Sequence, residues 1–325
     1  MKQVLKVSVL CAMVVFLIIT FFLIGCTAEA AAPLTAVPVI TKADKPWNIG
    51  FVFKGLTNEW AQKMLADTKS HAADIGIVMK ADGMEDIEFQ TNLIESYITL
   101  KMDAIVIAPT DAKGLVPPVV KAMKAGIVVI NVDSMLNQAL LKDAGVVVPY
   151  IGPDNRAAAK LSGDELGKVL SAGDKVVILE GEPGAENGQQ RTLGFKDSVQ
   201  EYNLKLVASE TAHWQVDPAF TLMGDLLTTY PDMKGVMADN DNMALGALQA
   251  IDAAGKTGKI LVVGFDNDSP AQQFIKEGKM LATIEQYGGQ VASWGLDAAV
   301  ATLQGATFAS LVPTKVELIT KEDLQ

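Results

Sequence analysis

The chain has 325 residues, half of them hydrophobic and 20% charged, so it can bury a large core, and its length favours two domains over one. Its formal net charge of -11 argues against nucleic acid and against an anionic membrane surface as binding partners. No cysteine follows Cys26, which excludes disulfides, thiolate metal sites and a cysteine nucleophile from the sequence after it.

The amino-terminal stretch predicts export. Two lysines precede an apolar run over residues 7–24, and the run leads into Leu-Ile-Gly-Cys, so we predict a secretory signal over residues 1–25. This ending resembles the bacterial lipoprotein signal, in which Cys26 becomes the lipid-modified first residue. A membrane-spanning anchor is the alternative, because the run just reaches the ~17 residues that a bilayer requires. Residues 26–46, rich in Ala, Pro and Thr, predict a flexible tether that leaves the folded part outside the cytoplasmic membrane.

From residue 48 onward, apolar strands alternate with amphipathic helical segments. This is the pattern of a parallel sheet covered by helices on both faces. A first series has helices beginning near residues 58, 86 and 113, and strands predicted at 49–53, 77–81, 104–108, 127–132 and 146–152. A second series has helices predicted at 156–170, 189–202, 218–229, 243–254 and 270–277, and strands at 175–179, 204–208, 235–238, 260–265 and 281–285.

Two series of similar length predict two similar lobes. A helix at 289–303 and a strand at 315–318 follow the second series, so we expect both to return to the first lobe. The chain would then cross near Gly152, Gln286 and Lys315, which allows a hinge and a cleft between the lobes. We assign residues 47–152 and 287–315 to an N-terminal lobe, and residues 153–286 and 316–325 to a C-terminal lobe.

Three of the predicted strands end in an acidic or amide residue. Asp133 follows one strand, Asn240 follows a second, and Phe265-Asp266 follows a third. Ligands of open parallel α/β sheets bind beyond the carboxyl ends of the strands. We therefore expect Phe265 and Asp266 to contact a ligand, and the three strand ends to meet at one crevice.

The motifs of familiar enzyme classes are missing from the sequence. There is no His-Glu-x-x-His, no Gly-x-Ser-x-Gly and no Gly-x-Gly-x-x-Gly, and the chain has two histidines. Residues 239–242 (Asp-Asn-Asp-Asn) begin like a calcium loop but lack its later glycine and glutamate. We predict no metal, no cofactor and no enzymatic activity.

One enzymatic alternative needs only carboxylates. A glycosidase using Asp133 and Asp266 would need one of the two carboxyl groups to have a raised pKa. We expect Arg191 and Lys54 to keep both carboxylates ionised, which disfavours this alternative.

A neutral polyhydroxyl ligand matches the side chains that are present. It needs planar groups that share hydrogen bonds with neighbouring hydroxyls, and flat apolar surfaces for the C–H faces of its ring. Both kinds occur at the ends of predicted elements: Lys54, Asn58, Trp60, Asp133, Arg191, Trp214, Asn240, Phe265, Asp266 and Gln286. Structural alternatives stay open, since Asn58 can cap a helix, either tryptophan can belong to a core, and Arg191 can pair with Asp133.

Three segments carry a family resemblance: ADNDNMALGALQA at 238–250, AGKTGKILVVGFD at 254–266 and GKMLATIEQ at 278–286. With these the chain resembles the ribose/allose class of periplasmic sugar-binding proteins, the extracytoplasmic receptors of ABC importers, over nearly all of its length from residue 49. The resemblance implies the type I periplasmic binding protein fold, in which two Rossmann-like lobes with parallel sheets, joined by a three-strand hinge, close on a monosaccharide. It also implies an ABC permease as partner, and we expect a monomer.

The resemblance also implies roles for individual residues. Hydroxyl ligands fall on Asp133, Arg191, Asn240, Asp266 and Gln286, a further contact falls on Asn58, and the ring faces pack on Trp60 and Trp214. Lys54 stands where allose-type receptors carry a lysine.

Three residues depart from the ribose type: Ala61, Ala108 and Ser134. Allose, ribose, another hexose or pentose and an acyclic polyol therefore stay open as ligands. A sugar-sensing receptor that signals to a kinase or chemoreceptor is the alternative function.

Overall fold

The computed structural model of the protein describes residues 34–325. The predicted signal at residues 1–25 and the lipid attachment at Cys26 lie outside the described residues. Over residues 34–325, every helix is too short or too polar to cross a membrane.

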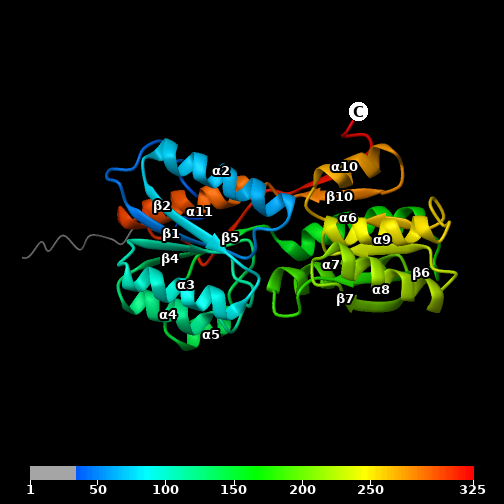
Figure 1. Cartoon of the computed structure of the whole chain (residues 1–325), viewed down its shortest axis with the longest axis horizontal. Helices are drawn as coiled ribbons and strands as arrows, with labels where there is room; N and C mark the ends of the chain where they lie inside the picture. The colour runs from blue at the N-terminus through cyan, green and yellow to red at the C-terminus, as the bar shows by residue number, and fades with distance from the viewer. Residues whose placement is uncertain (1–33) are drawn as a thin grey trace, which may run out of the picture. The chain divides into compact units, whose positions relative to one another are not determined.

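The first of two sheets has six parallel strands in the order β11-β5-β4-β3-β1-β2 (Figure 1). Its central strand β3 is apolar and buried throughout, as expected of a strand covered on both faces. The strands are β1 (Asn48–Phe53), β2 (Val78–Gly83), β3 (Ala104–Ile107), β4 (Val128–Val132), β5 (Tyr150–Gly152) and β11 (Leu311–Pro313). The helices between them are α2 (Glu59–Ile75), α3 (Ile87–Thr99), α4 (Val116–Lys124) and α5 (Gln138–Asp143).

The second sheet also has six strands, in the order β12-β10-β9-β8-β6-β7. All pairs are parallel except β12 with β10, which is antiparallel. The strands are β6 (Lys175–Glu180), β7 (Lys205–Thr211), β8 (Gly235–Ala238), β9 (Leu261–Val263), β10 (Ala282–Glu285) and β12 (Glu317–Thr320). The helices are α6 (Asn155–Val169), α7 (Glu186–Glu201), α8 (Val216–Thr229), α9 (Asp241–Ala253) and α10 (Ser269–Lys276).

Each sheet separates two hydrophobic cores. In β1, Ile49, Phe51 and Phe53 belong to the core shared with α2, while Val52 belongs to the core on the opposite face. This is the two-residue alternation of a strand. The second sheet is covered in the same way on both faces.

The last elements return to different lobes. Helix α11 (Gly288–Leu303) packs on α2 and the first sheet, as predicted, and His71 Nε2 lies 2.7 Å from Asp297 Oδ1 between the two helices. The strand predicted at 315–318 was expected to return to the first lobe, but β12 pairs with β10 in the second sheet, so that expectation is wrong; the pairing instead follows the lobe bounds, which place residues 316–325 in the C-terminal lobe. The strand that joins the first sheet is β11, which is three residues long and has a single buried residue, Val312, so it gives only a short signal in the sequence.

The segment before β1 differs from the flexible tether predicted over residues 26–46. Leu34 N–H donates to the Thr307 carbonyl at 2.8 Å, and Ala309 N–H donates to the Leu34 carbonyl at 2.8 Å. Val37 and Ile40 pack against the core of the first lobe. The apolar side chains within this stretch have surface to bury, and burying it orders residues 34–46.

Candidate functional site

The three polar strand ends line one cavity. Asp133 follows β4, Asn240 follows β8 and Asp266 follows β9, and all three belong to its wall. The wall includes residues of both lobes. Nine of the ten predicted residues line it: Lys54, Asn58, Trp60, Asp133, Arg191, Trp214, Asn240, Asp266 and Gln286.

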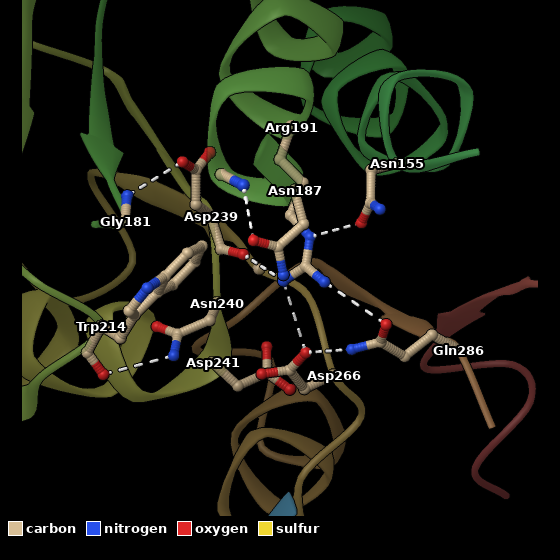
Figure 2. Close-up of polar contacts among 12 residues, drawn as sticks. Asn155, Gly181, Asn187, Arg191, Trp214, Asp239, Asn240, Asp241, Asp266 and Gln286 are labelled. Atoms are coloured by element: carbon tan, nitrogen blue, oxygen red, sulfur yellow. Dashed lines mark hydrogen bonds and ion pairs between the residues drawn. The ribbon is translucent and has the colours of Figure 1, made fainter. Parts of the chain in front are cut away.

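Arg191 is the centre of the polar network shown in Figure 2. It is 2% exposed, and its Nε donates to Asn155 Oδ1 at 2.9 Å while Nη1 donates to the Asp239 carbonyl at 2.9 Å. Nη2 donates to Gln286 Oε1 at 3.3 Å. A guanidinium carries a planar fork of donors, and here several of them are fixed by protein acceptors, so its orientation is set without a ligand.

Asp266 is the anionic partner of Arg191. Its Oδ1 lies 3.6 Å from Arg191 Nη1 and accepts a 2.7 Å hydrogen bond from Gln286 Nε2. Burial raises the pKa of Asp266 well above its usual range, and the charge of Arg191 opposes this rise. The direction of this shift runs against the expectation that Arg191 and Lys54 hold this carboxyl ionised, because one ion pair does not offset its desolvation.

The carboxylate of Asp133 is available to a ligand. The side chain lines the cavity and is 3% exposed, yet within residues 34–325 it has neither a hydrogen-bond nor an ion-pair partner. Its carbonyl is held by the Tyr150 hydroxyl, which donates at 2.9 Å. A buried carboxylate without protein partners can bind two neighbouring hydroxyls.

Backbone conformation is unusual at three residues of the wall. Asp133 has φ 62°, Trp214 has φ 63° and Asp266 has φ 122°. Positive φ is costly for residues with a Cβ and concentrates at functional sites, where surrounding structure maintains it. It turns these side chains away from the direction that a continuing strand would give them.

Two of the three asparagines of the wall, Asn58 and Asn240, are helix caps. Asn58 Oδ1 accepts from Ala61 N–H at 2.8 Å at the start of α2, and Asn240 Oδ1 accepts from Met243 N–H at 2.9 Å at the start of α9. The capping alternative for Asn58 is thus confirmed. Asn240 Nδ2 also donates to the Trp214 carbonyl at 3.3 Å, which links two parts of the wall.

The two tryptophans of the wall each pack against a glycine. A Cβ on Gly288 would lie 2.6 Å from Trp60 Nε1, and a Cβ on Gly181 would lie 2.1 Å from the Trp214 ring. Only glycine allows these approaches. Both indole N–H groups are buried and, in the described part of the chain, have no acceptor.

Lys54 reaches from the first lobe to the second. Its Nζ donates to Asn187 Oδ1 at 3.2 Å and lies 4.5 Å from the centroid of the Trp214 ring. Removal from water lowers the pKa of Lys54, while Asp133 and Glu85 oppose that effect. The ammonium is therefore held by a neutral amide and an aromatic face.

Phe265, the tenth predicted residue, does not line the cavity. It is fully buried and lies with Val263 in the core of the second lobe. Residues two apart in an extended chain face the same way, so Phe265 follows Val263 into the core, while the positive φ of Asp266 breaks the alternation at the next residue. The prediction that Phe265 contacts a ligand is wrong for this reason.

Several residues of the wall were not predicted. Asn187 precedes Arg191 by four residues on α7, and this helical spacing was a usable signal. Glu85 comes just after β2, where the strand-end rule applies. Ala61 and Ala108, two of the departures from the ribose type, also line the wall and leave space there.

The periplasmic binding protein domain, as a sequence family, matches residues 49–307. The chain belongs to the periplasmic binding protein family. This periplasmic binding protein is 39% identical over 297 residues to the D-ribose/D-allose-binding protein of Pseudomonas aeruginosa, covering 89% of this chain and 92% of that relative. It is 34% identical over 218 residues to the ribose import binding protein of Salmonella typhimurium, covering 67% and 71%.

Among solved structures, this periplasmic binding protein is similar to an ABC transporter periplasmic solute-binding protein from Actinobacillus succinogenes with bound D-allose. The TM-score is 0.82 at 32% identity, covering 86% of this chain and 99% of that one. The predicted ribose/allose type and the fold of two α/β lobes are confirmed. The relatives are binding proteins rather than enzymes.

Proposed function

We propose that this chain is an extracytoplasmic solute-binding lipoprotein. It captures an allose- or ribose-like sugar, or a related polyol, between its lobes and delivers it to an ABC importer. The Asp133 carboxylate carries the proposal, because this buried acceptor lines the cavity and has no partner in the part of the chain that the structure describes. The hydroxyl groups of a sugar can donate the hydrogen bonds that this carboxylate lacks.

The proposed contacts divide by chemistry. Asp133, Arg191 and Asp266 make charge-assisted hydrogen bonds to hydroxyls, each worth about 1.5–3 kcal/mol. Trp60 and Trp214 pack against the C–H faces of the ring. The remaining polar contacts come from Lys54, Asn58, Asn240 and Gln286.

Closure follows from the distribution of these groups. Asp133 and Trp60 belong to the first lobe, while Arg191 and Asp266 belong to the second. A ligand satisfies all of them only when the lobes hold it together, so binding favours the closed state.

A thermal-shift screen of pentoses, hexoses and polyols tests the ligand class. We expect D-allose or D-ribose to raise the melting temperature in proportion to the logarithm of its concentration. Calorimetry should then give one site per chain. No shift with any compound of the screen would contradict the proposal.

Lipid anchoring at Cys26 is part of the proposal and rests on the sequence before residue 27. Expression of the full chain in a bacterium with radiolabelled palmitate should label the protein and place it in the membrane fraction. Cys26→Ser should abolish the label. Label retained by Cys26→Ser would exclude this attachment site.

Delivery and signalling both use closure, so they need a separate test. We expect deletion of the gene to abolish uptake of the radiolabelled sugar at micromolar concentration, and the wild-type gene to restore it. Normal uptake, together with loss of a sugar response in chemotaxis or kinase activity, would favour the sensing alternative.

We also propose that the protein has no hydrolytic activity. The raised pKa of Asp266 is the observation that makes a test worthwhile, because a glycosidase needs one protonated carboxyl group. Incubation with nitrophenyl glycosides of allose, ribose and glucose should release no chromophore. Turnover that Asp266→Asn abolishes would establish an enzyme.

A further inference from the structure

A second cavity of about 230 Å³ adjoins the first. Its wall comes from α2, the loop between β9 and α10, and the start of α11. Trp60 and Asp266 line both cavities, so the two spaces are neighbours. The network around Arg191 does not extend to the rest of this wall.

The wall of the second cavity is strongly acidic. It contains Glu59, Asp67, Asp266, Asp268 and Glu285, against a single cation, Lys63. Lys63 is exposed, and across residues 34–325 it comes within ion-pair distance of none of these carboxylates. Asp266 is paired with Arg191, whereas the other four carboxyl groups of the wall have no ion-pair partner within residues 34–325.

Asp268 is a buried carboxyl group of this wall that does not stabilise the helix it precedes. It is the N-cap residue of α10 and is 9% exposed, yet its side chain accepts no hydrogen bond from the helix. Its backbone N–H donates to Asp241 Oδ2 at 3.0 Å, but among residues 34–325 its side chain has neither a hydrogen bond nor an ion pair. Asn58 and Asn240, at the same position of α2 and α9, do cap their helices.

A second acceptor beside it is also unused. Asn267 Nδ2 donates to Glu285 Oε2 at 3.0 Å, which fixes the amide, and the opposite atom, Asn267 Oδ1, is buried without a donor from the described chain. Such an atom costs free energy unless something donates to it. Glu59, by contrast, accepts from the Ser269 hydroxyl at 2.5 Å.

Electrostatics adds to the geometry. Burial, together with the charges of Glu59 and Glu285, raises the pKa of Asp268 to about 6, and Lys63 opposes this. A cationic ligand in the cavity would lower the pKa of Asp268 again, because it would offset the negative charges of Glu59 and Glu285. A bare metal ion does not match, because no three acidic or histidine side chains of the described residues lie close enough to share one.

We infer that this second cavity is an amine subsite, in which Asp268 forms the ion pair with a protonated primary amine. An ammonium group has three donors and no acceptor, which fits the unpartnered carboxyl group of Asp268. The amine belongs either to an amino sugar held in the first cavity or to a separate small molecule. The amino-sugar source rests on the proposed function, and the separate source does not.

The test is calorimetry on the full chain at about pH 7.5, where Asp268 is mostly ionised. Ethanolamine is titrated into protein saturated with D-allose, with ethylene glycol as the neutral control at matched ionic strength. In parallel, D-glucosamine, D-galactosamine and D-mannosamine are compared with their parent hexoses. Binding of ethanolamine would show that the subsite takes a separate small amine. An amino sugar that binds more tightly than its parent hexose would show that the amine is a substituent of the sugar in the first cavity.

Variants test whether this subsite causes the preference for amines. Asp268→Asn should weaken the amine preference about tenfold, as expected for one charge-assisted bond. Asp217→Asn, an exposed acid in the first turn of α8, should leave it unchanged. Asp67→Asn should weaken it several-fold and serves as the second variant if Asp268→Asn does not fold. An amine preference that is absent in the wild type, or intact in Asp268→Asn, overturns the inference.

Two further outcomes separate competing explanations. If ethanolamine binds only after Lys63→Gln, Lys63 is the resident ammonium and the inference is wrong. Titration of neutral sugars into wild type and Asp268→Asn reports on the first cavity alone. Amine binding without any neutral sugar binding would sink the proposed function and leave the amine subsite standing.

Discussion

The guanidinium carbon of Arg191 lies 3.6 Å from the centroid of the Phe265 ring. Arg191 also faces the Trp214 ring, at 5.7 Å. A cation on an aromatic face gains about 0.5–2 kcal/mol, more when it is desolvated, as Arg191 is. Phe265 therefore acts on the cavity through Arg191 rather than by contact with a ligand.

Replacing Phe265 should weaken sugar binding without unfolding the protein. In Phe265→Leu the core keeps a large apolar side chain, but the support of Arg191 is lost, so we expect a drop in affinity of about tenfold. Calorimetry with the sugar found in the screen measures it. Phe195→Leu, in the same core, is the control and should change the melting temperature but not the affinity. Equal loss of affinity in both variants would argue against the role of Phe265.

Removing the charge of Asp266 should separate binding from stability. Because burial raises the pKa of this carboxyl, its ionised form costs stability, which Asp266→Asn relieves. We expect affinity to fall about 10–100-fold, while the melting temperature of the empty protein stays equal or rises. A large drop in melting temperature with affinity kept would make Asp266 a structural residue.

The tryptophans of the cavity should report ligand by fluorescence. The chain has four tryptophans, and Trp60 and Trp214 line the cavity. A sugar that packs on them changes the surroundings of both indoles, so saturating sugar should change the emission. The double variant with Trp60→Phe and Trp214→Phe should lose the response, and Trp294→Phe should keep it. A response that survives in the double variant would place the sugar elsewhere.

Asp239 should make stability depend on pH. It is fully buried, Gly181 N–H and the Thr192 hydroxyl each donate to its Oδ2 at 3.0 Å, and Oδ1 has no donor within the described range. Burial raises the pKa of Asp239 to about 7, against an ordinary value of 3.8, with Arg191 lowering it and Glu180 raising it. Between these two values the unfolded chain is ionised and the folded one protonated, so the free energy of unfolding falls as the pH rises.

The corresponding measurement is a melting-temperature profile of wild type and Asp239→Asn. The melting temperature of Asp239→Asn minus that of the wild type should increase by about 5 °C between about pH 4 and pH 7 and stay constant at higher pH. Using the difference removes pH effects common to both proteins, including that of His71, whose pKa is raised by Asp297. A flat difference would mean that Asp239 does not titrate in this range.

The sequence predicted the fold well wherever a strand is buried on both faces. Runs such as Ala104–Ile107 and Gly235–Ala238 are apolar throughout and stand out for that reason. The failures are at the edges of the sheets, where β11 has one buried residue and β12 none. Which sheet an edge strand joins depends on contacts with segments far away in the sequence, so the hydrophobic pattern of the strand itself does not predict it.

The site was predicted by strand ends and family resemblance, with errors of a different kind. Strand alternation alone would have turned Phe265 into the core beside Val263. Asn187 escaped notice because its contact with Lys54 joins positions 133 residues apart on different lobes. Gly181 and Gly288 gave no signal either, since the need for glycine comes from the indoles that pack on them.

The bonds of Leu34 to Thr307 and Ala309 have a use in measuring motion. A dye on a cysteine placed at exposed Pro38 must move with the first lobe, and a dye at exposed Glu322, just after β12, must move with the second. Both native cysteines precede this region, so the pair can be installed in a background without them. Single-molecule energy transfer between the dyes would then measure how long the two lobes stay open and closed as a ligand binds and dissociates.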